Sequence, residues 1–208
     1  MNGAIRVARA SDAEAVAAIY RPAVTEAVTS FELEPPAAGE MAARMAAVLE
    51  RTPWIVCDGG SGVLGYAYAS RHRDRAAYQW SVEVSAYVRS DAQGRGVGRA
   101  LYTSLFEILA LQGFRNAYAG ITLPNPASSG MHRALGFTPV GIYRGVGYKN
   151  GAWHDVEWLE RSIAPQMVDP PSPVPFPELA GTDALQRALD AGAPLLKIPL
   201  TATAHIPL

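Results

Sequence analysis

The segment 87–99 is the part of the sequence best suited to hold a ligand. It reads Tyr-Val-Arg-Ser-Asp-Ala-Gln-Gly-Arg-Gly-Val-Gly-Arg, between a strand pattern that ends at Val88 and a helix pattern that follows. Glycine lets backbone N–H groups approach an anion closely, and a helix N-terminus adds partial positive charge and unpaired donors. We therefore expect this loop to bind a phosphate group, with Arg95 and Arg99 adding positive charge.

Two common phosphate-binding patterns do not fit this loop. The Walker A pattern needs a lysine after its last glycine, and none is present. The dinucleotide fingerprint needs a third glycine where Arg99 stands and an acidic residue about 20 positions later, where the sequence has none. The residue pattern that this loop does contain is Gln93-x-x-Gly96-x-Gly98. For the loop alone, the alternative is a flexible glycine turn that caps a helix.

Glu83 is the second candidate, because it lies inside an otherwise apolar strand pattern over residues 77–88. Strand periodicity places it on one face with Ser85 and Tyr87. The other face is apolar and carries Val82, Val84, Ala86 and Val88. A carboxylate is costly to bury among apolar groups, so a carboxylate retained here suits a proton-accepting role. The structural alternative is a glutamate paired with an arginine.

Basic residues supply further candidates. Arg71, Arg73 and Arg75 precede the strand of Glu83, and arginine binds carboxylates through two parallel hydrogen bonds. A solvated basic loop is the alternative for any one of them. His132 could donate a proton near neutral pH, and its alternative role is packing on a helix surface.

Periodicity predicts the elements that position these residues. Ser11 and Glu14 form a capping-box pattern before the first helix, and a turn at Asn150 and Gly151 joins the last two strands. The expected strands are 5–9, 54–57, 63–69, 77–88, 116–121, 138–148 and 153–161; the later helices are 40–51, 101–111 and 128–135. This order predicts an α/β (α+β) fold in which helices flank one mixed sheet.

The composition changes after Ile163. Nine prolines lie between residues 165 and 208, so this stretch cannot form a long regular helix or central strand. We expect a domain over 1–163 and a Pro-rich extension over 164–208. In the extension, residues 164–178 are expected to be extended, and a short helix begins at Thr182. The apolar segment 195–208 is expected to pack on the main domain or on a neighbouring subunit.

Charge and composition exclude several function classes. The 208-residue chain has 18 Lys and Arg against 19 Asp and Glu, which disfavours general binding to nucleic acids or anionic membranes. Cys57 is the single cysteine, and the four histidines lack metal-site spacing, so we expect no disulfide and no metal. No secretory or membrane-spanning pattern is present, and we expect a cytoplasmic protein.

The ordered motifs resemble a known superfamily. Q-x-x-G-x-G between a strand and a helix is similar to the diphosphate loop of the GCN5-related N-acetyltransferases (GNAT), which bind acetyl-CoA. Leu135-Gly136-Phe137 resembles the closing signature of that superfamily. Four further stretches are similar to its phosphinothricin acetyltransferase-like subgroup: 78–83, 120–125, 131–137 and 147–155. The resemblance covers about residues 4–163.

The resemblance implies a mostly antiparallel GNAT sheet and a role for each candidate residue. Glu83 is expected to be the general base and His132 the general acid. The resemblance implies cofactor contacts from two short segments and one asparagine, namely Ala86, Tyr87, Val88, Gln93, Gly94, Arg95, Gly96, Val97, Gly98, Arg99 and Asn125. It implies acceptor contacts from Phe31, Arg75 and Tyr78, and a homodimer.

The expected function is therefore acetyl transfer from acetyl-CoA to the α-amine of a small amino acid or analogue. Phosphinothricin, methionine sulfone and methionine sulfoximine are the acceptors that the resemblance implies. Two alternatives remain open. One is acetylation of a peptide or protein amine, which needs an open cleft; the other is a CoA-binding sensor without turnover.

Overall fold

The structure, a computed structural model, describes residues 3–197, which build a seven-stranded sheet. In spatial order the strands are β1 (Ala4–Val7), β2 (Trp54–Asp58), β3 (Val63–Arg71), β4 (Ser81–Val88), β5 (Asn116–Thr122), β7 (Ala152–Ser162) and β6 (Thr138–Lys149). Neighbouring strands run antiparallel except β4 and β5, which run parallel. The expected mixed, mostly antiparallel sheet is confirmed.

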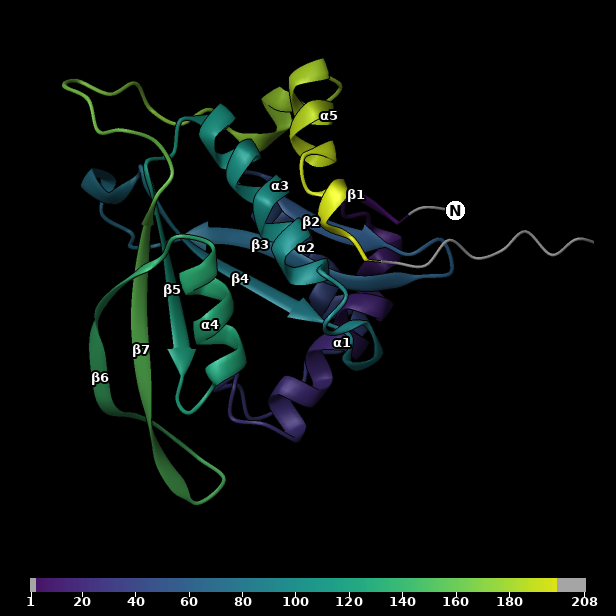
Figure 1. Cartoon of the computed structure of the whole chain (residues 1–208), viewed down its shortest axis with the longest axis vertical. Helices are drawn as coiled ribbons and strands as arrows, with labels where there is room; N and C mark the ends of the chain where they lie inside the picture. The colour runs from purple at the N-terminus through teal and green to yellow at the C-terminus, as the bar shows by residue number, and fades with distance from the viewer. Residues whose placement is uncertain (1–2, 198–208) are drawn as a thin grey trace, which may run out of the picture.

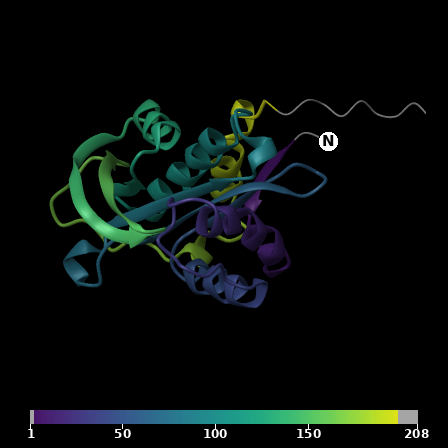
Figure 2. The same ribbon diagram turned by 90° about the horizontal axis from the view of Figure 1, so that it is seen from below.

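Helices cover both faces of the sheet, as Figure 2 shows. One face carries α1 (Ala13–Thr25) and α2 (Ala38–Leu49), and the other carries α3 (Val97–Gln112), α4 (Pro126–Ala134) and α5 (Asp183–Asp190). Each layer of helices has its own apolar core against the sheet. The larger core surrounds α3, whose Leu101, Leu105 and Leu109 are completely buried.

The sheet splits between β4 and β5. The two strands pair at only three positions, Ser81 with Asn116, Val82 with Ala117 and Glu83 with Tyr118. Beyond Glu83, β4 continues along β3 and β5 continues along β7, so the two strands diverge (Figure 1). The edges of β4 and β5 that face each other past this point do not pair, and they can bind an extended ligand.

Three local predictions differ in an instructive way from the structure. The expected helix at 101–111 begins at Val97, directly after Gly96, whose φ of 78° ends the preceding loop. The expected strand at 77–88 begins at Ser81, because residues Ala76–Tyr78 form a 3-10 turn.

The third error is the capping box that was expected at Ser11 and Glu14. Instead, the Asp12 side chain reaches back to the start of the 3-10 turn over Ala10–Asp12, which precedes α1. Asp12 accepts the Arg9 backbone N–H at 2.7 Å and also binds Arg6, whose guanidinium lowers the pKa of Asp12. The ion pair with β1 therefore decides where the chain turns into α1.

The segment after Ile163 packs against the sheet domain. The Val174 N–H donates to the Gln112 carbonyl at the end of α3, and Phe176 is buried in the larger core. A 3-10 turn over Phe176–Leu179 interrupts the extended course that was expected there. Thr182 caps α5, as its sequence position suggested. Of the apolar segment 195–208, residues 198–208 lie outside the described residues.

No helix among residues 3–197 is long and apolar enough to cross a membrane.

Candidate active site

Glu83 stands where the sheet splits, at the last paired position of β4 and β5. On one face of β4, Val82 and Val84 are buried in the core around α3. Tyr87 lies on the other face and packs edge-on against Tyr20 of α1, with ring centroids 4.9 Å apart. Strand alternation therefore turns Glu83 towards the side of the sheet that α1 and α2 cover.

The Glu83 carboxylate is held by two basic side chains. Its Oε1 lies 3.0 Å from Nδ1 of His72 and accepts a hydrogen bond from Nη1 of Arg73 at 3.2 Å. The His72 ring stacks on Tyr118 with centroids 4.3 Å apart, so its position is set by packing. Both contacts use the same oxygen, and the Glu83 side chain is 31% exposed. Oε2 is thus the oxygen suited to receive a proton from an amine.

His72 is a functional candidate that the sequence analysis missed. His72 lies outside the motifs that resemble the family, and the spacing of the four histidines spoke only against a metal site. The signal was the strand register: Ser70 pairs with Glu83 across β3 and β4, and His72 follows Ser70 by two residues. Antiparallel register, which short-range patterns do not reveal, brings these side chains together.

One of the predicted acceptor residues, Tyr78, lies beside the histidine that contacts Glu83. Tyr78 is 43% exposed, and its ring centroid lies 6.0 Å from that of His72. Arg75 caps the 3-10 turn through its backbone carbonyl, and Arg73, not Arg75, contacts Glu83. Phe31 lies against Gly147 so closely that a Cβ at Gly147 would overlap its ring. The glycine is therefore required for Phe31 to pack beside β6.

The loop over residues 93–96 has the geometry of an anion-binding turn. Gly94 and Gly96 adopt φ values of 72° and 78°, which residues with side chains rarely adopt. Gly96 is the N-cap of α3, so the first N–H groups of this 16-residue helix point out of the loop. Gln93 and Arg95 are exposed at the loop and Arg99 at the first turn of α3. Gly98 is buried, and a Cβ there would lie 2.9 Å from Sδ of Met131 in α4.

Asn125 and the end of β4 flank the same gap. The Asn125 Oδ1 accepts the Ser128 N–H at 3.1 Å and caps α4, which leaves its NH2 group as the donor for a ligand. Ala86, Tyr87 and Val88 are on the part of β4 that pairs with β3 and has separated from β5. The unpaired edge of β4 thus leads from the glycine loop back to Glu83.

His132 lies on the opposite side of the sheet from Glu83. It is 4% exposed and packs edge-on against Tyr102 and Phe137. Its Nδ1 lies 2.8 Å from the Ser128 carbonyl, so Nδ1 carries the proton, and Nε2 accepts from the Tyr102 hydroxyl at 3.1 Å. Burial lowers the pKa of His132. The sheet therefore separates His132 from Glu83, and the role of His132 as general acid stays a prediction.

Within residues 3–197, no group of three or more His, Cys, Asp or Glu side chains is arranged to hold a metal ion. Cys57 is buried in β2, and burial raises the pKa of its thiol to about 11. The thiol is therefore protonated at neutral pH and does not act as a nucleophile.

Comparisons with known proteins agree with this geometry. The family model described as an acetyltransferase (GNAT) domain matches residues 5–158. A phosphinothricin N-acetyltransferase of Streptomyces viridochromogenes is 38% identical over 82% of this chain and 92% of its own length. An L-methionine sulfoximine/L-methionine sulfone acetyltransferase of Pseudomonas paraeruginosa is 34% identical over 79% of this chain and 97% of its own.

A solved structure shares the fold closely. The phosphinothricin acetyltransferase of Sinorhizobium meliloti, in complex with AcCoA, superposes with a TM-score of 0.78 at 36% identity, covering 82% of this chain and 94% of its own. The split sheet, the glycine loop and these matches lead to one conclusion. The chain belongs to the GNAT family of N-acetyltransferases, in its phosphinothricin acetyltransferase-like subgroup.

Proposed function

We propose that this enzyme transfers the acetyl group of acetyl-CoA directly to the α-amine of a small amino acid or analogue of the phosphinothricin or methionine sulfone and sulfoximine type. The observation that carries the proposal is the position of Glu83 where β4 leaves β5, at one end of the gap whose other end meets the glycine loop. The names of relatives at 34% and 38% identity support this acceptor class.

In the proposed binding mode, the amides around Gly96 bind the diphosphate at the N-terminus of α3. Gln93, Gly94, Arg95, Val97, Gly98 and Arg99 complete this loop. The unpaired edge of β4 at Ala86, Tyr87 and Val88 bonds the pantetheine amides, and Asn125 contributes its NH2 group. This arrangement directs the thioester towards Glu83.

The chemistry requires an amine with a lone pair. An α-ammonium group has a pKa near 8, so most of it is protonated at neutral pH. Oε2 of Glu83 accepts this proton, directly or through water, while His72 and Arg73 hold Oε1. The amine then attacks the thioester carbonyl, a C–N bond forms and the C–S bond breaks. The proton that the new amide nitrogen loses passes to the departing thiolate, so that CoA leaves as the thiol. Arg75, Tyr78 and Phe31 are proposed to line the acceptor side.

A thiol-release assay over a panel of amino acids and analogues tests the function. We expect CoA release that depends on a free α-amine, with phosphinothricin, methionine sulfone or methionine sulfoximine among the best acceptors. Mass spectrometry of intact cellular proteins, with and without the enzyme, separates this outcome from protein acetylation. CoA binding without thiol release for any acceptor would favour a sensor and contradict the proposal.

A homodimer is part of the proposal. The hairpin of β6 and β7 carries a group of exposed apolar side chains: Val140, Ile142, Tyr143, Val146, Tyr148 and Trp153. Exposed apolar side chains gathered on one element are typical of protein interfaces. Sedimentation of the wild type should give twice the chain mass, and Trp153→Lys should shift it towards the monomer.

We also propose a cytoplasmic location, because acetyl-CoA is an intracellular metabolite. Fractionation of cells that carry a tagged chain tests it, with enzyme activity and the tag measured in the same fractions.

A further inference from the structure

The chain beyond the family match runs along α3 towards the glycine loop. Leu185, Ala188 and Leu189 of α5 are buried in the core around α3. Ser104 of α3 donates through Oγ to the Leu189 carbonyl at 2.7 Å and accepts the Gly192 N–H at 3.1 Å. These contacts anchor the C-terminal segment on α3, between its middle and its N-terminal end (Figure 1, yellow).

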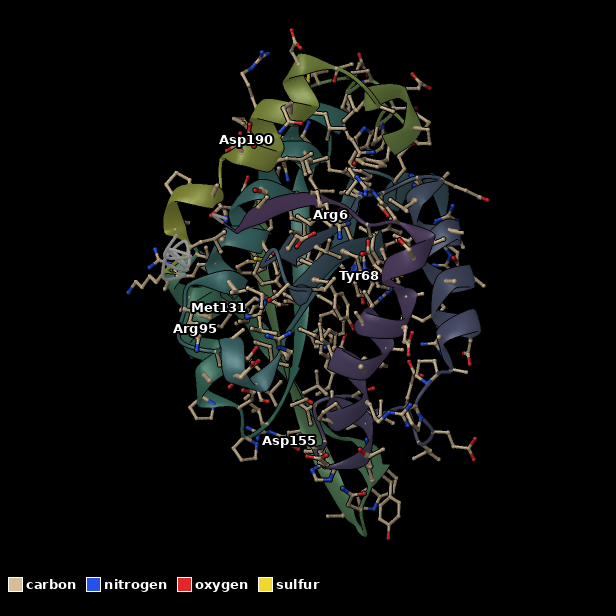
Figure 3. All side chains as sticks on the ribbon, turned by 90° about the vertical axis from the view of Figure 1, so that its right-hand side faces the viewer. Arg6, Tyr68, Arg95, Met131, Asp155 and Asp190 are labelled. Atoms are coloured by element: carbon tan, nitrogen blue, oxygen red, sulfur yellow. The ribbon has the colours of Figure 1, made fainter. Side chains whose placement is uncertain are left out.

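The segment 193–197 then ends on the loop itself. Leu195 and Leu196 pack against the core around α3, and a Cβ at Gly96 would overlap the Leu195 carbonyl oxygen. The Lys197 backbone N–H donates to the Arg95 carbonyl at 2.9 Å. Figure 3 shows Arg95 below this C-terminal turn, on the same side of the molecule as Met131.

The hydrogen bond from Lys197 determines the orientation of one peptide plane. In a trans peptide the carbonyl of one residue and the N–H of the next point in opposite directions. The Arg95 carbonyl points to Lys197, so the Gly96 N–H points away from the C-terminal segment. Gly96 has no side chain to oppose a flip of this plane. A flip would exchange the N–H for a carbonyl oxygen, which repels an anion.

We propose that segment 193–197 positions the diphosphate loop without itself contacting the cofactor: its backbone contacts with the carbonyl of Arg95 and with Gly96 hold the loop so that the Gly96 N–H faces the diphosphate. The inference rests on the proposed binding mode and adds a positioning element from outside the match to the family model, which ends at residue 158. A loop held in its binding conformation loses less entropy when the cofactor binds.

The test compares two variants of Lys197 in the full chain. Lys197→Pro removes the backbone N–H, whereas Lys197→Ala removes the side-chain charge and keeps the N–H. Proline is compatible with the preceding residue, because Leu196 has φ of −73° and ψ of 120°. We measure the Kd for CoA by calorimetry, and for acetyl transfer the KM for acetyl-CoA and kcat at saturation. Melting temperatures control for folding.

For Lys197→Pro we expect the Kd and the KM to rise about fivefold to tenfold, the effect of one lost hydrogen bond. We expect kcat at saturation to stay within twofold, and Lys197→Ala to match the wild type. Equal values for all three proteins would overturn the proposal. An effect of Lys197→Ala as large as that of Lys197→Pro would do so as well, because it would assign the role to the side chain.

The proposed function and the proposed role of segment 193–197 are refuted by different results. If the wild type binds CoA but transfers no acetyl group, the proposed function fails, while the Kd comparison still tests the role of the segment. If the wild type transfers acetyl groups and Lys197→Pro is unchanged in Kd and KM, the function stands and the role of segment 193–197 is refuted.

Discussion

The two faces of the sheet hold their histidines in different ways. On the side of α1 and α2, His72 lies next to Glu83, whose carboxylate is 31% exposed. On the side of α3 and α4, His132 is 4% exposed, and both of its ring nitrogens have partners within the protein. A histidine that binds a partly exposed carboxylate can take part in proton transfer, whereas one with both nitrogens engaged in a core mainly stabilises the fold. The comparison predicts a chemical role for His72 and a mainly structural role for His132.

The largest expected effect is that of Glu83→Gln. The amide keeps the shape of the side chain but cannot accept a proton, and general-base catalysis contributes roughly 10²–10⁴-fold to a rate. We expect kcat to fall by about that factor at neutral pH, while the Kd for CoA stays unchanged. Raising the pH should recover part of the activity, because more of the amine is then neutral. Activity equal to the wild type at both neutral and high pH would refute the assignment of the base.

His132→Asn tests the other face through stability. Loss of its buried hydrogen bonds should cost about 1–3 kcal/mol, or roughly 2–4 °C of Tm per kcal/mol for a chain of this size. We expect a smaller loss of kcat than for Glu83→Gln. An unchanged Tm together with a loss of kcat as large as that of Glu83→Gln would support His132 as the general acid.

The pH dependence of Tm sharpens the same comparison. Because burial lowers the pKa of His132, its neutral form stabilises the folded state fully above the unfolded pKa, about 6.5. This contribution is lost as the pH falls through the lower folded pKa. The Tm of the wild type should therefore fall more steeply below pH 6.5 than that of His132→Asn. Loss of the Asp12 charge destabilises both proteins at lower pH still, because the Arg6 guanidinium lowers the pKa of this carboxyl below its usual range.

His72→Phe is expected to have an intermediate effect. Phenylalanine keeps a ring against Tyr118 but removes the Nδ1 contact with Glu83. Loss of a hydrogen bond to a charged group should lower kcat roughly tenfold, with the KM for acetyl-CoA unchanged. A kcat like that of the wild type would show that His72 only packs.

The smallest effects are expected at the arginines near Glu83. Arg75→Ala should raise the KM for the acceptor severalfold if this exposed side chain binds its carboxylate, with little change in kcat. Arg73→Ala should change kcat more than the acceptor KM, because Arg73 contacts the Glu83 carboxylate. The reverse pattern would exchange the two roles. Arg71→Ala, in which a side chain paired with Asp74 is removed, serves as the control.

Local patterns predicted most of the elements around these residues. The Asn150-Gly151 turn has the positive φ values of 52° and 78° that its sequence suggests, and it joins β6 and β7 as expected. Thr182 caps α5 because its side chain accepts the Leu185 N–H, a contact within one turn. Such features depend on residues a few positions apart, so the sequence itself reveals them.

Predictions were wrong or incomplete where distant segments meet. The turn at Asp12 depends on Arg6, which Asp58 of β2 also holds, and the role of His72 depends on the register of β3 against β4. Helix periodicity alone did not distinguish a catalytic role of His132 from a packing role. Its contact with Tyr102, 30 residues away in the chain, is what favours packing.

The sequence by itself determined the order of the elements, the glycine-rich turn before α3 and the acidic residue inside β4, because local backbone preference and side-chain alternation encode them. Only the tertiary structure decided which basic groups meet Glu83 and where the last segment of the described chain lies. Those contacts join residues up to about 100 positions apart, from Arg95 to Lys197, and they form only once the sheet and α3 have packed.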